Sequence, residues 1–158
     1  MRQMNSMKRI YANEEVCIGC KLCEIWCVVQ HSKSKDIIKA FKHELQKADP
    51  KVLVEISKPI SFALQCRHCN EPDCVYACIS GAMYIDEDGS VQHNADKCVG
   101  CCSCIMVCPY GAITISRDAQ LKGVKVVSKC DLCPDSDVPA CVAHCPNEAL
   151  VYVEEVID

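Results

Sequence analysis

The chain of 158 residues is long enough for one compact domain or for two small modules that share a core. Half of its residues are hydrophobic, but 17 of them are cysteine and few are aromatic (one Trp, five Tyr and two Phe), so the core needs crosslinks from disulfides or bound metal. The formal net charge of −4 excludes the basic composition of nucleic-acid-binding proteins, and we expect no nucleic acid partner.

The N-terminal residues Met1–Ile10 include basic side chains but no apolar run of the kind found in secretory signals. No stretch of about 18 or more apolar residues occurs in the chain, so we expect no direct membrane insertion. These features predict a cytoplasmic protein. Structural disulfides are rare in the reducing cytoplasm, and an odd number of cysteines cannot pair completely. Bound metal is then the expected crosslink.

Three elements are expected in the first part of the chain. Leu22–His31 is predicted to be a helix that carries Cys27 one turn after Cys23. Asp36–Lys47 has apolar residues at helical spacing and is predicted to be a second helical segment. Val52–Ile56 alternates in the manner of a strand.

The second part of the chain is predicted to contain two hairpins and a final strand. Ala82–Asp86 and Ser90–His93 flank an Asp-Gly pair, which is a strong turn signal between strands. Ala112–Ser116 and Val124–Ser128 form the second expected hairpin. Ala149–Val153 is expected to close the fold as a strand.

A repeat of cysteines organises the chain. Four quartets, each with three residues between its third and fourth cysteine, use sixteen of the 17 cysteines. In chain order they are quartet one (Cys17, Cys20, Cys23, Cys27), quartet two (Cys66, Cys69, Cys74, Cys78), quartet three (Cys98, Cys101, Cys104, Cys108) and quartet four (Cys130, Cys133, Cys141, Cys145). Quartets one and three have the spacing C-x2-C-x2-C-x3-C, in which three thiolates hold one 4Fe-4S cluster and the fourth holds its neighbour.

Residues beside the cysteines support this interpretation. Pro109 and Pro146 directly follow the last cysteine of quartets three and four, as in the bacterial ferredoxin run. Gly19 and Gly100 precede a cysteine in the two compact quartets, where a missing side chain lets backbone N–H groups turn toward an anionic cluster. The pattern therefore favours iron-sulfur clusters.

Zinc is the main alternative, because C-x2-C pairs also form zinc ribbons in which two distant pairs enclose one metal. Three cysteines at positions i, i+3 and i+6, followed by a fourth on the next helix, fit that scheme poorly. Cys102 belongs to no quartet and is interpreted as a small buried residue, with a redox or spare-ligand role as the alternative.

Four other features are open to two interpretations. His68 and His144 each directly precede a quartet cysteine and are predicted to be partly exposed loop residues; the alternative is that their protonation affects a cluster. Trp26 is predicted to pack in the core and not to relay electrons. A basic stretch follows the first helix: Lys33, Lys35, Lys39 and Lys42. We expect it to be a solvated face, with a docking site as the alternative.

The sixteen cysteines, together with Cys130-Asp131-Leu132-Cys133 and Cys145-Pro146, give the chain its resemblance to a known family. It resembles, over roughly residues 8–155, the four-cluster ferredoxin-like electron-transfer subunits found beside molybdenum oxidoreductases, formate dehydrogenases, hydrogenases and carbon monoxide dehydrogenases. Met7–Glu44 looks most similar to the electron-transfer subunit of nickel carbon monoxide dehydrogenase (CooF-type).

The resemblance implies an α+β fold of two pseudo-symmetric bacterial-ferredoxin-like modules. The outer module is expected at residues 8–65 plus 129–158, with a helical insertion at 34–48, and the inner module at 66–128. Quartet one then pairs with quartet four and quartet two with quartet three, whereas spacing alone left a pairing of three with four equally open.

The same resemblance implies four 4Fe-4S clusters bound through iron to sixteen cysteines. The implied ligand sets are Cys17, Cys20, Cys23 and Cys145 for cluster 1, Cys66, Cys69, Cys74 and Cys108 for cluster 2, Cys98, Cys101, Cys104 and Cys78 for cluster 3, and Cys130, Cys133, Cys141 and Cys27 for cluster 4.

The implied function is electron transfer without catalysis. The sequence has no complete phosphate loop, no dinucleotide fingerprint and no Ser or His triad pattern, so no catalytic residue is expected. Carbon monoxide dehydrogenase is the favoured partner. A hydrogenase, a formate dehydrogenase or an NAD-linked flavoprotein are the alternatives, as is a freely diffusing polyferredoxin without a fixed partner.

Overall fold

The computed structural model describes residues 5–45, 48–117, 123 and 125–157. Its helices are α1 (Leu22–His31), α2 (Asp73–Tyr76), α3 (Ser103–Val107) and α5 (Ala140–Ala143), with the helical turns η1 (Lys39–His43) and η2 (Ala95–Lys97). Its strands are β1 (Asn5–Ala12), β2 (Val52–Ser57), β3 (Ile60–Gln65), β4 (Met83–Ile85), β5 (Val91–His93), β6 (Thr114–Ile115), β7 (Val127–Ser128) and β8 (Leu150–Ile157).

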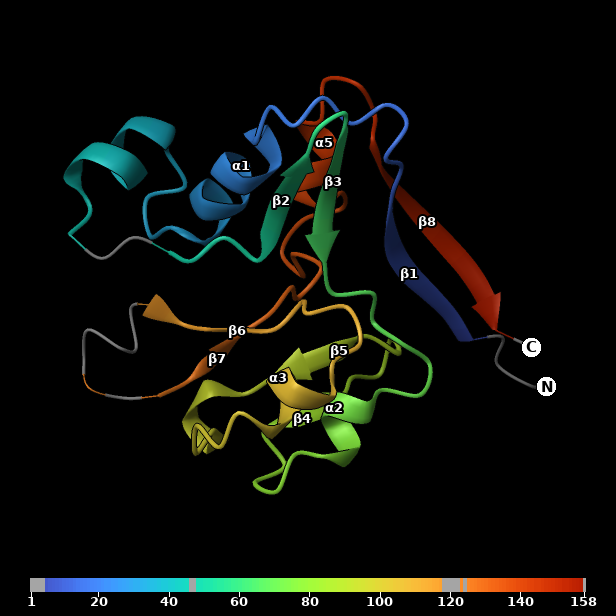
Figure 1. Ribbon diagram of the computed structural model, residues 1–158. Coiled ribbons are helices and arrows are strands. Elements are labelled where there is room, and N and C mark those ends of the chain that lie inside the picture. The colour runs from blue at the N-terminus through green and yellow to red at the C-terminus, as the bar shows by residue number, and fades with distance from the viewer. Residues whose placement is uncertain (1–4, 46–47, 118–122, 124, 158) are drawn as a thin grey trace.

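Within the described residues, the strands form separate two-stranded antiparallel sheets that pair β1 with β8, β2 with β3, β4 with β5 and β6 with β7. Figure 1 shows α1, α5 and the β2–β3 hairpin in its upper part, and α2, α3 and the β4–β5 hairpin in its lower part. Helix α1 packs against α5, and α2 packs against α3. The expected α+β class, with short helices and small sheets, is confirmed.

The two ends of the described chain lie side by side. Strand β1 pairs with β8 from Asn5 opposite Ile157 to Ala12 opposite Leu150, and Figure 1 shows this ribbon extending away from the helices. Ile10 and Leu150 are buried at the inner end of the ribbon. The closing strand expected at Ala149–Val153 is confirmed and is longer, whereas its partner β1 was missed.

Helix α1 begins and ends where the sequence predicts. It starts after Lys21, which has a left-handed backbone conformation (φ 61°), and it buries Cys23, Cys27, Val28 and Val29 on one face. The next predicted helix, Asp36–Lys47, is confirmed only as the short turn η1, and residues 46 and 47 lie outside the described residues.

The β2–β3 hairpin covers the side of α1. Val52 and Val54 of β2 and Ala63 of β3 point into the core. The strand expected at Val52–Ile56 is confirmed, and β3 was not predicted. The two hairpins expected later in the chain are present, and β4–β5 and β6–β7 pair over three and two residues per strand, fewer than predicted. Val124, the first residue of one expected strand, lies outside the described residues.

Cysteine supplies much of the buried volume. One core cluster joins Ile10, Val52 and Leu150 to cysteines of quartets one, two and four, and a second joins Met83, Ile113 and Val127 to Cys104. No helix among the described residues combines the length and apolar character needed to cross a membrane. The fold therefore brings thiols together where a larger protein would place aliphatic side chains.

Candidate metal centre

All 17 cysteines lie within the described residues, and all are free thiols. The resemblance groups sixteen of them into four expected ligand sets. One cavity is lined by the cluster 1 set, Cys17, Cys20, Cys23 and Cys145. The rest of this cavity is largely apolar and includes Val54, Ala63 and Leu150. Burial raises the pKa of the Cys23 thiol to about 12.

The cluster 4 set is buried throughout: Cys27, Cys130, Cys133 and Cys141. These thiols come from α1, from the loop after β7 and from α5, and they lie close enough to interact. Burial, followed by the charges of Cys130, Cys27 and Cys133, raises the pKa of Cys141. This set is the most enclosed of the four.

The cluster 2 and cluster 3 sets line two separate cavities. Cys66, Cys69, Cys74 and Cys108 line one cavity, and Cys78, Cys98, Cys101 and Cys104 line another. Burial raises the pKa of Cys74 and of Cys104 to about 11 each. In both sets three cysteines belong to one quartet and the fourth comes from the other.

The four sets follow one another in space. Cys23 of the cluster 1 set is among the thiols that raise the pKa of Cys141 after burial, and Cys66 of the cluster 2 set does the same for Cys130. Cys74 packs in the same core cluster as Cys104 of the cluster 3 set. The order is therefore 1, 4, 2, 3. Each end of the row has an exposed cysteine, Cys20 at one and Cys101 at the other.

Tight backbone turns hold the compact quartets. Gly19 and Gly100 have φ values of 66° and 68°, as expected for glycine beside a ligand loop. A Cβ atom at Gly100 would lie 2.3 Å from the carbonyl oxygen of Lys125, so no other residue fits there. Cys102 follows at φ 61°, and its thiol donates to the carbonyl of Gly100 at 3.4 Å.

Cys102 also lines the cavity of the cluster 3 set. It is half-buried, so the expectation that it is buried is wrong. The physical reason is its position at the start of α3, where the loop reaches the surface.

Backbone N–H groups donate to several cysteine sulfurs. These hydrogen bonds show whether the sets fit an anionic cluster. The donors and acceptors are Lys51 to Cys27 (3.2 Å), Ala149 to Cys145 (3.2 Å), Met83 to Cys78 (3.4 Å), His68 to Cys66 (3.5 Å) and Leu132 to Cys130 (3.5 Å). Such donors stabilise the thiolate form of cysteine, which is the form that binds iron. The donor set therefore fits 4Fe-4S clusters.

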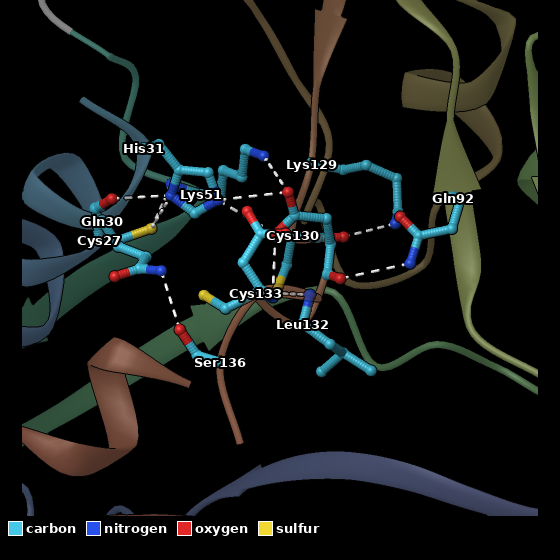
Figure 2. A network of polar contacts seen from close by, with 12 residues as sticks. Cys27, Gln30, His31, Lys51, Gln92, Lys129, Cys130, Leu132, Cys133 and Ser136 are labelled. Carbon is cyan, nitrogen blue, oxygen red and sulfur yellow. Dashed lines mark hydrogen bonds and ion pairs between the residues drawn. The ribbon is translucent and has the colours of Figure 1, made fainter. Parts of the chain in front are cut away.

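An ionic network lies beside the cluster 4 set (Figure 2). Asp131 accepts from Lys51 Nζ at 2.6 Å and from His31 Nε2 at 3.1 Å, and it also accepts the backbone N–H of Cys133 at 3.1 Å. His31 Nδ1 donates to the carbonyl of Cys27 at 2.7 Å. Although burial lowers the pKa of His31, the hydrogen bonds to Asp131 and to Cys27 more than compensate and raise it to about 9.

Sequence reasoning missed this network, because its three side chains are far apart in the chain. The one available signal was Asp131, which lies between two quartet cysteines. The His31 and Lys51 positions carry no local pattern that links them to it.

The histidines and the tryptophan beside the quartets differ in environment. His68 is fully buried (0% exposed), so its prediction as a partly exposed loop residue is wrong. The reason is that β5 covers it, and the N–H of Val91 donates to His68 Nδ1 at 3.0 Å. His144 is exposed, as predicted, and stacks on Trp26, which is half-buried and packs against that ring.

The basic stretch is solvated, as predicted. Its four lysines, Lys33, Lys35, Lys39 and Lys42, are exposed. Lys35 approaches Asp135 at 3.9 Å, which is a weak surface contact.

Comparison with known proteins agrees with these observations. The profile of the 4Fe-4S dicluster domain matches residues 58–155. The chain is 36% identical to an iron-sulfur protein of Rhodospirillum rubrum, covering 92% of this chain and 81% of that protein. It is 35% identical to the electron transport protein HydN of Escherichia coli (92% and 87%) and 31% identical to the thiosulfate reductase electron transfer subunit PhsB of Salmonella typhi (94% and 78%).

A solved structure shares the fold at lower sequence identity. A chain of the active site complex BamBC of benzoyl coenzyme A reductase superposes with a TM-score of 0.51 at 20% identity, covering 97% of this chain and 80% of that chain. The family profile over residues 58–155 and the relatives above 30% identity show that this protein belongs to the 4Fe-4S dicluster family of ferredoxin-like electron-transfer proteins.

Proposed function

We propose that the chain carries four 4Fe-4S clusters and relays electrons between a redox enzyme and another acceptor. The observation that supports this most is the row of four cysteine sets with an exposed cysteine at each end and a fully buried set inside. Such an arrangement lets electrons enter and leave at the surface and keeps the middle of the path away from water.

The proposed ligands are the four sets that the resemblance implies, and a shared cavity supports three of them. They are Cys17, Cys20, Cys23 and Cys145 for cluster 1, Cys27, Cys130, Cys133 and Cys141 for cluster 4, Cys66, Cys69, Cys74 and Cys108 for cluster 2, and Cys78, Cys98, Cys101 and Cys104 for cluster 3. A bound 4Fe-4S cluster supplies reversible one-electron redox chemistry. The chain holds the thiolates, excludes water and donates backbone N–H groups to sulfur, which together tune the potential.

We also propose that two modules divide the chain. The outer module takes residues 8–65 plus 129–158, and the inner module takes 66–128. The packing of α1 on α5 and of α2 on α3 supports this division, since each pair joins the two quartets of one module.

The proposed role is that of a subunit without catalysis of its own. The printed names of HydN and PhsB, an electron transport protein and an electron transfer subunit, support it. For the partner, the likeness of Met7–Glu44 to the CooF-type subunit favours carbon monoxide dehydrogenase over a hydrogenase, a formate dehydrogenase or a flavoprotein. The 17 free cysteines favour the reducing cytoplasm as its location.

Anaerobic purification tests the cluster number. We expect about sixteen irons and sixteen labile sulfides per chain, with about four irons per cluster. Zinc without sulfide, or a folded protein with clearly fewer irons, would contradict the proposal. The partner is tested separately by mixing the reduced protein with each candidate enzyme. Absorbance follows cluster oxidation, and co-elution detects binding. If no candidate exchanges electrons with the protein, the proposed role as an electron-transfer subunit of these enzymes is contradicted.

A further inference from the structure

Lys129 is buried at the centre of the row of cysteine sets, with 4% of its surface exposed. Its Nζ donates to the carbonyl oxygen of Cys130 at 2.5 Å and to the carbonyl oxygen of Val91. Both acceptors are neutral, and no described carboxylate forms an ion pair with Lys129. A buried ammonium group is costly unless negative charge lies close by. Cysteine thiolates beside it, Cys130 among them, are able to supply that charge.

Lys129 lies beside two cysteine sets. Its Nζ donates to the carbonyl of Cys130, which belongs to the cluster 4 set. It also donates to the carbonyl of Val91, a residue that lines the cavity of the cluster 2 set. Lys129 therefore lies where the two inner sets meet, on the path between the two exposed ends.

The same residue joins the two halves of the fold. Val91 lies in β5, next to Gln92, whose Nε2 donates to the carbonyl of Asp131 at 3.2 Å. Figure 2 shows the Lys129 side chain beside Gln92, with contacts from both to the backbone near Cys130. The buried His68 and the half-buried His93 nearby do not add to this positive charge, because burial, reinforced by Lys129, lowers the pKa of both.

We propose that Lys129 is a positioning residue whose buried positive charge raises the reduction potentials of the clusters held by the cluster 2 and cluster 4 sets. An arriving electron adds one negative charge, and a fixed positive charge in a weakly polar interior stabilises that state. With clusters bound on both sides, the junction would favour the reduced state. This inference rests on the proposed function.

A matched control exists in the chain. Lys97 directly precedes Cys98, the first cysteine of quartet three, as Lys129 directly precedes Cys130, the first cysteine of quartet four. Lys97 is exposed, so water screens its charge. The two lysines thus share their position relative to a quartet and differ in burial.

The test is a redox titration of the iron-loaded wild type and of Lys129→Gln, Lys129→Arg and Lys97→Gln, followed by electron paramagnetic resonance, with iron counted in each. For Lys129→Gln we expect the iron content to be unchanged. The reduction potential of at least one cluster should fall by about 59 mV, which is about a tenfold shift toward the oxidised form. Lys129→Arg and Lys97→Gln should titrate like the wild type, because the buried charge is kept in both.

Each outcome decides the inference. Unchanged potentials in Lys129→Gln would overturn it, as would an equal shift in Lys97→Gln. If Lys129→Gln fails to hold iron, retention of iron and of native potentials in Lys129→Arg supports the need for a charge, and loss of iron there too overturns it. A wild type that holds no 4Fe-4S clusters would instead contradict the proposed function.

Discussion

The indole ring of Trp26 stacks on the imidazole ring of His144, with ring centroids 3.6 Å apart and planes inclined by 14°. Each residue directly precedes the last cysteine of its quartet, Cys27 in one case and Cys145 in the other. In the proposed ligand sets these two cysteines are exchanged between quartets one and four. The stack therefore lies beside both exchanged ligands, since α1 carries Cys27 and Cys145 directly follows His144 after α5.

The first prediction concerns this stack. Trp26→Ala should lower the stability of the loaded protein by roughly 2 kcal/mol, less than the cost at a fully buried tryptophan because Trp26 is half-buried. Trp26→Phe should recover most of the loss, since an aromatic ring remains. Thermal unfolding under anaerobic conditions measures the effect. Tyr76→Ala is the control, because Tyr76 is 70% exposed; an equal loss there would show that the stack has no special role.

The second prediction concerns the turn before Cys101. Gly100→Ala should disrupt the cluster 3 set and remove about four irons per chain, because the added Cβ would meet the Lys125 carbonyl at 2.3 Å and the backbone has φ 68°. Gly81→Ala is the matched control. Gly81 has a similar φ of 65° but no atom within 4 Å of the added Cβ, so only the strain of about 1–2 kcal/mol remains.

Iron analysis and thermal unfolding separate the two glycine variants. We expect full iron content with slightly lower stability in Gly81→Ala. Full iron content in Gly100→Ala would mean that the Lys125 segment moves away, and the proposed close packing at this loop would be wrong.

The fold was predictable where local pattern and tertiary burial agree. In α1, the helical spacing of Cys23 and Cys27 coincides with the buried face, and the predicted bounds were correct. Strand β3 was missed because its buried positions are occupied by Ser61, Ala63 and Gln65, while its larger apolar residues point outward. Its alternation is therefore the reverse of the pattern that predicts a strand.

The candidate site divides in the same way. The sixteen candidate cysteines could be chosen from their spacing, because a bound 4Fe-4S cluster would impose that spacing within each quartet. Their environment could not. The burial of His68 and Lys129 depends on β5, which lies more than twenty residues from one and more than thirty from the other in the chain. Contacts between residues so far apart in the chain produce no local pattern in the sequence.

The third prediction concerns the network beside the cluster 4 set. Asp131→Asn removes the negative charge that Lys51 and His31 share, and it leaves both cations partly buried without a partner. Breaking a fully buried pair costs about 3–5 kcal/mol, so we expect about 2 kcal/mol here, where the three side chains are partly exposed. Thermal unfolding measures this loss.

Asp135→Asn is the control for that variant, because Asp135 approaches Lys35 at 3.9 Å but is largely exposed. Its effect should be close to zero. Equal losses in the two variants would indicate a general effect of negative charge in this loop, and the network would then have no stabilising role of its own.

The fourth prediction follows from the unequal exposure of the four cysteine sets. The cluster 1 and cluster 3 sets each include an exposed cysteine, Cys20 and Cys101, whereas the four cysteines of the cluster 4 set are buried. Mild oxidation in the presence of an iron chelator should therefore release iron in two phases, with the end clusters lost first, because opening of buried regions costs more free energy. Iron release followed by absorbance gives the two rates.

Cys20→Ser and Cys101→Ser identify the fast phase. Each variant should shrink that phase by about half and leave the slow phase unchanged, since each weakens one end of the row. Two outcomes would contradict the order 1, 4, 2, 3: iron release in a single phase from the wild type, or a smaller slow phase in either variant. Either result would mean that an exposed set does not lie at an end of the row.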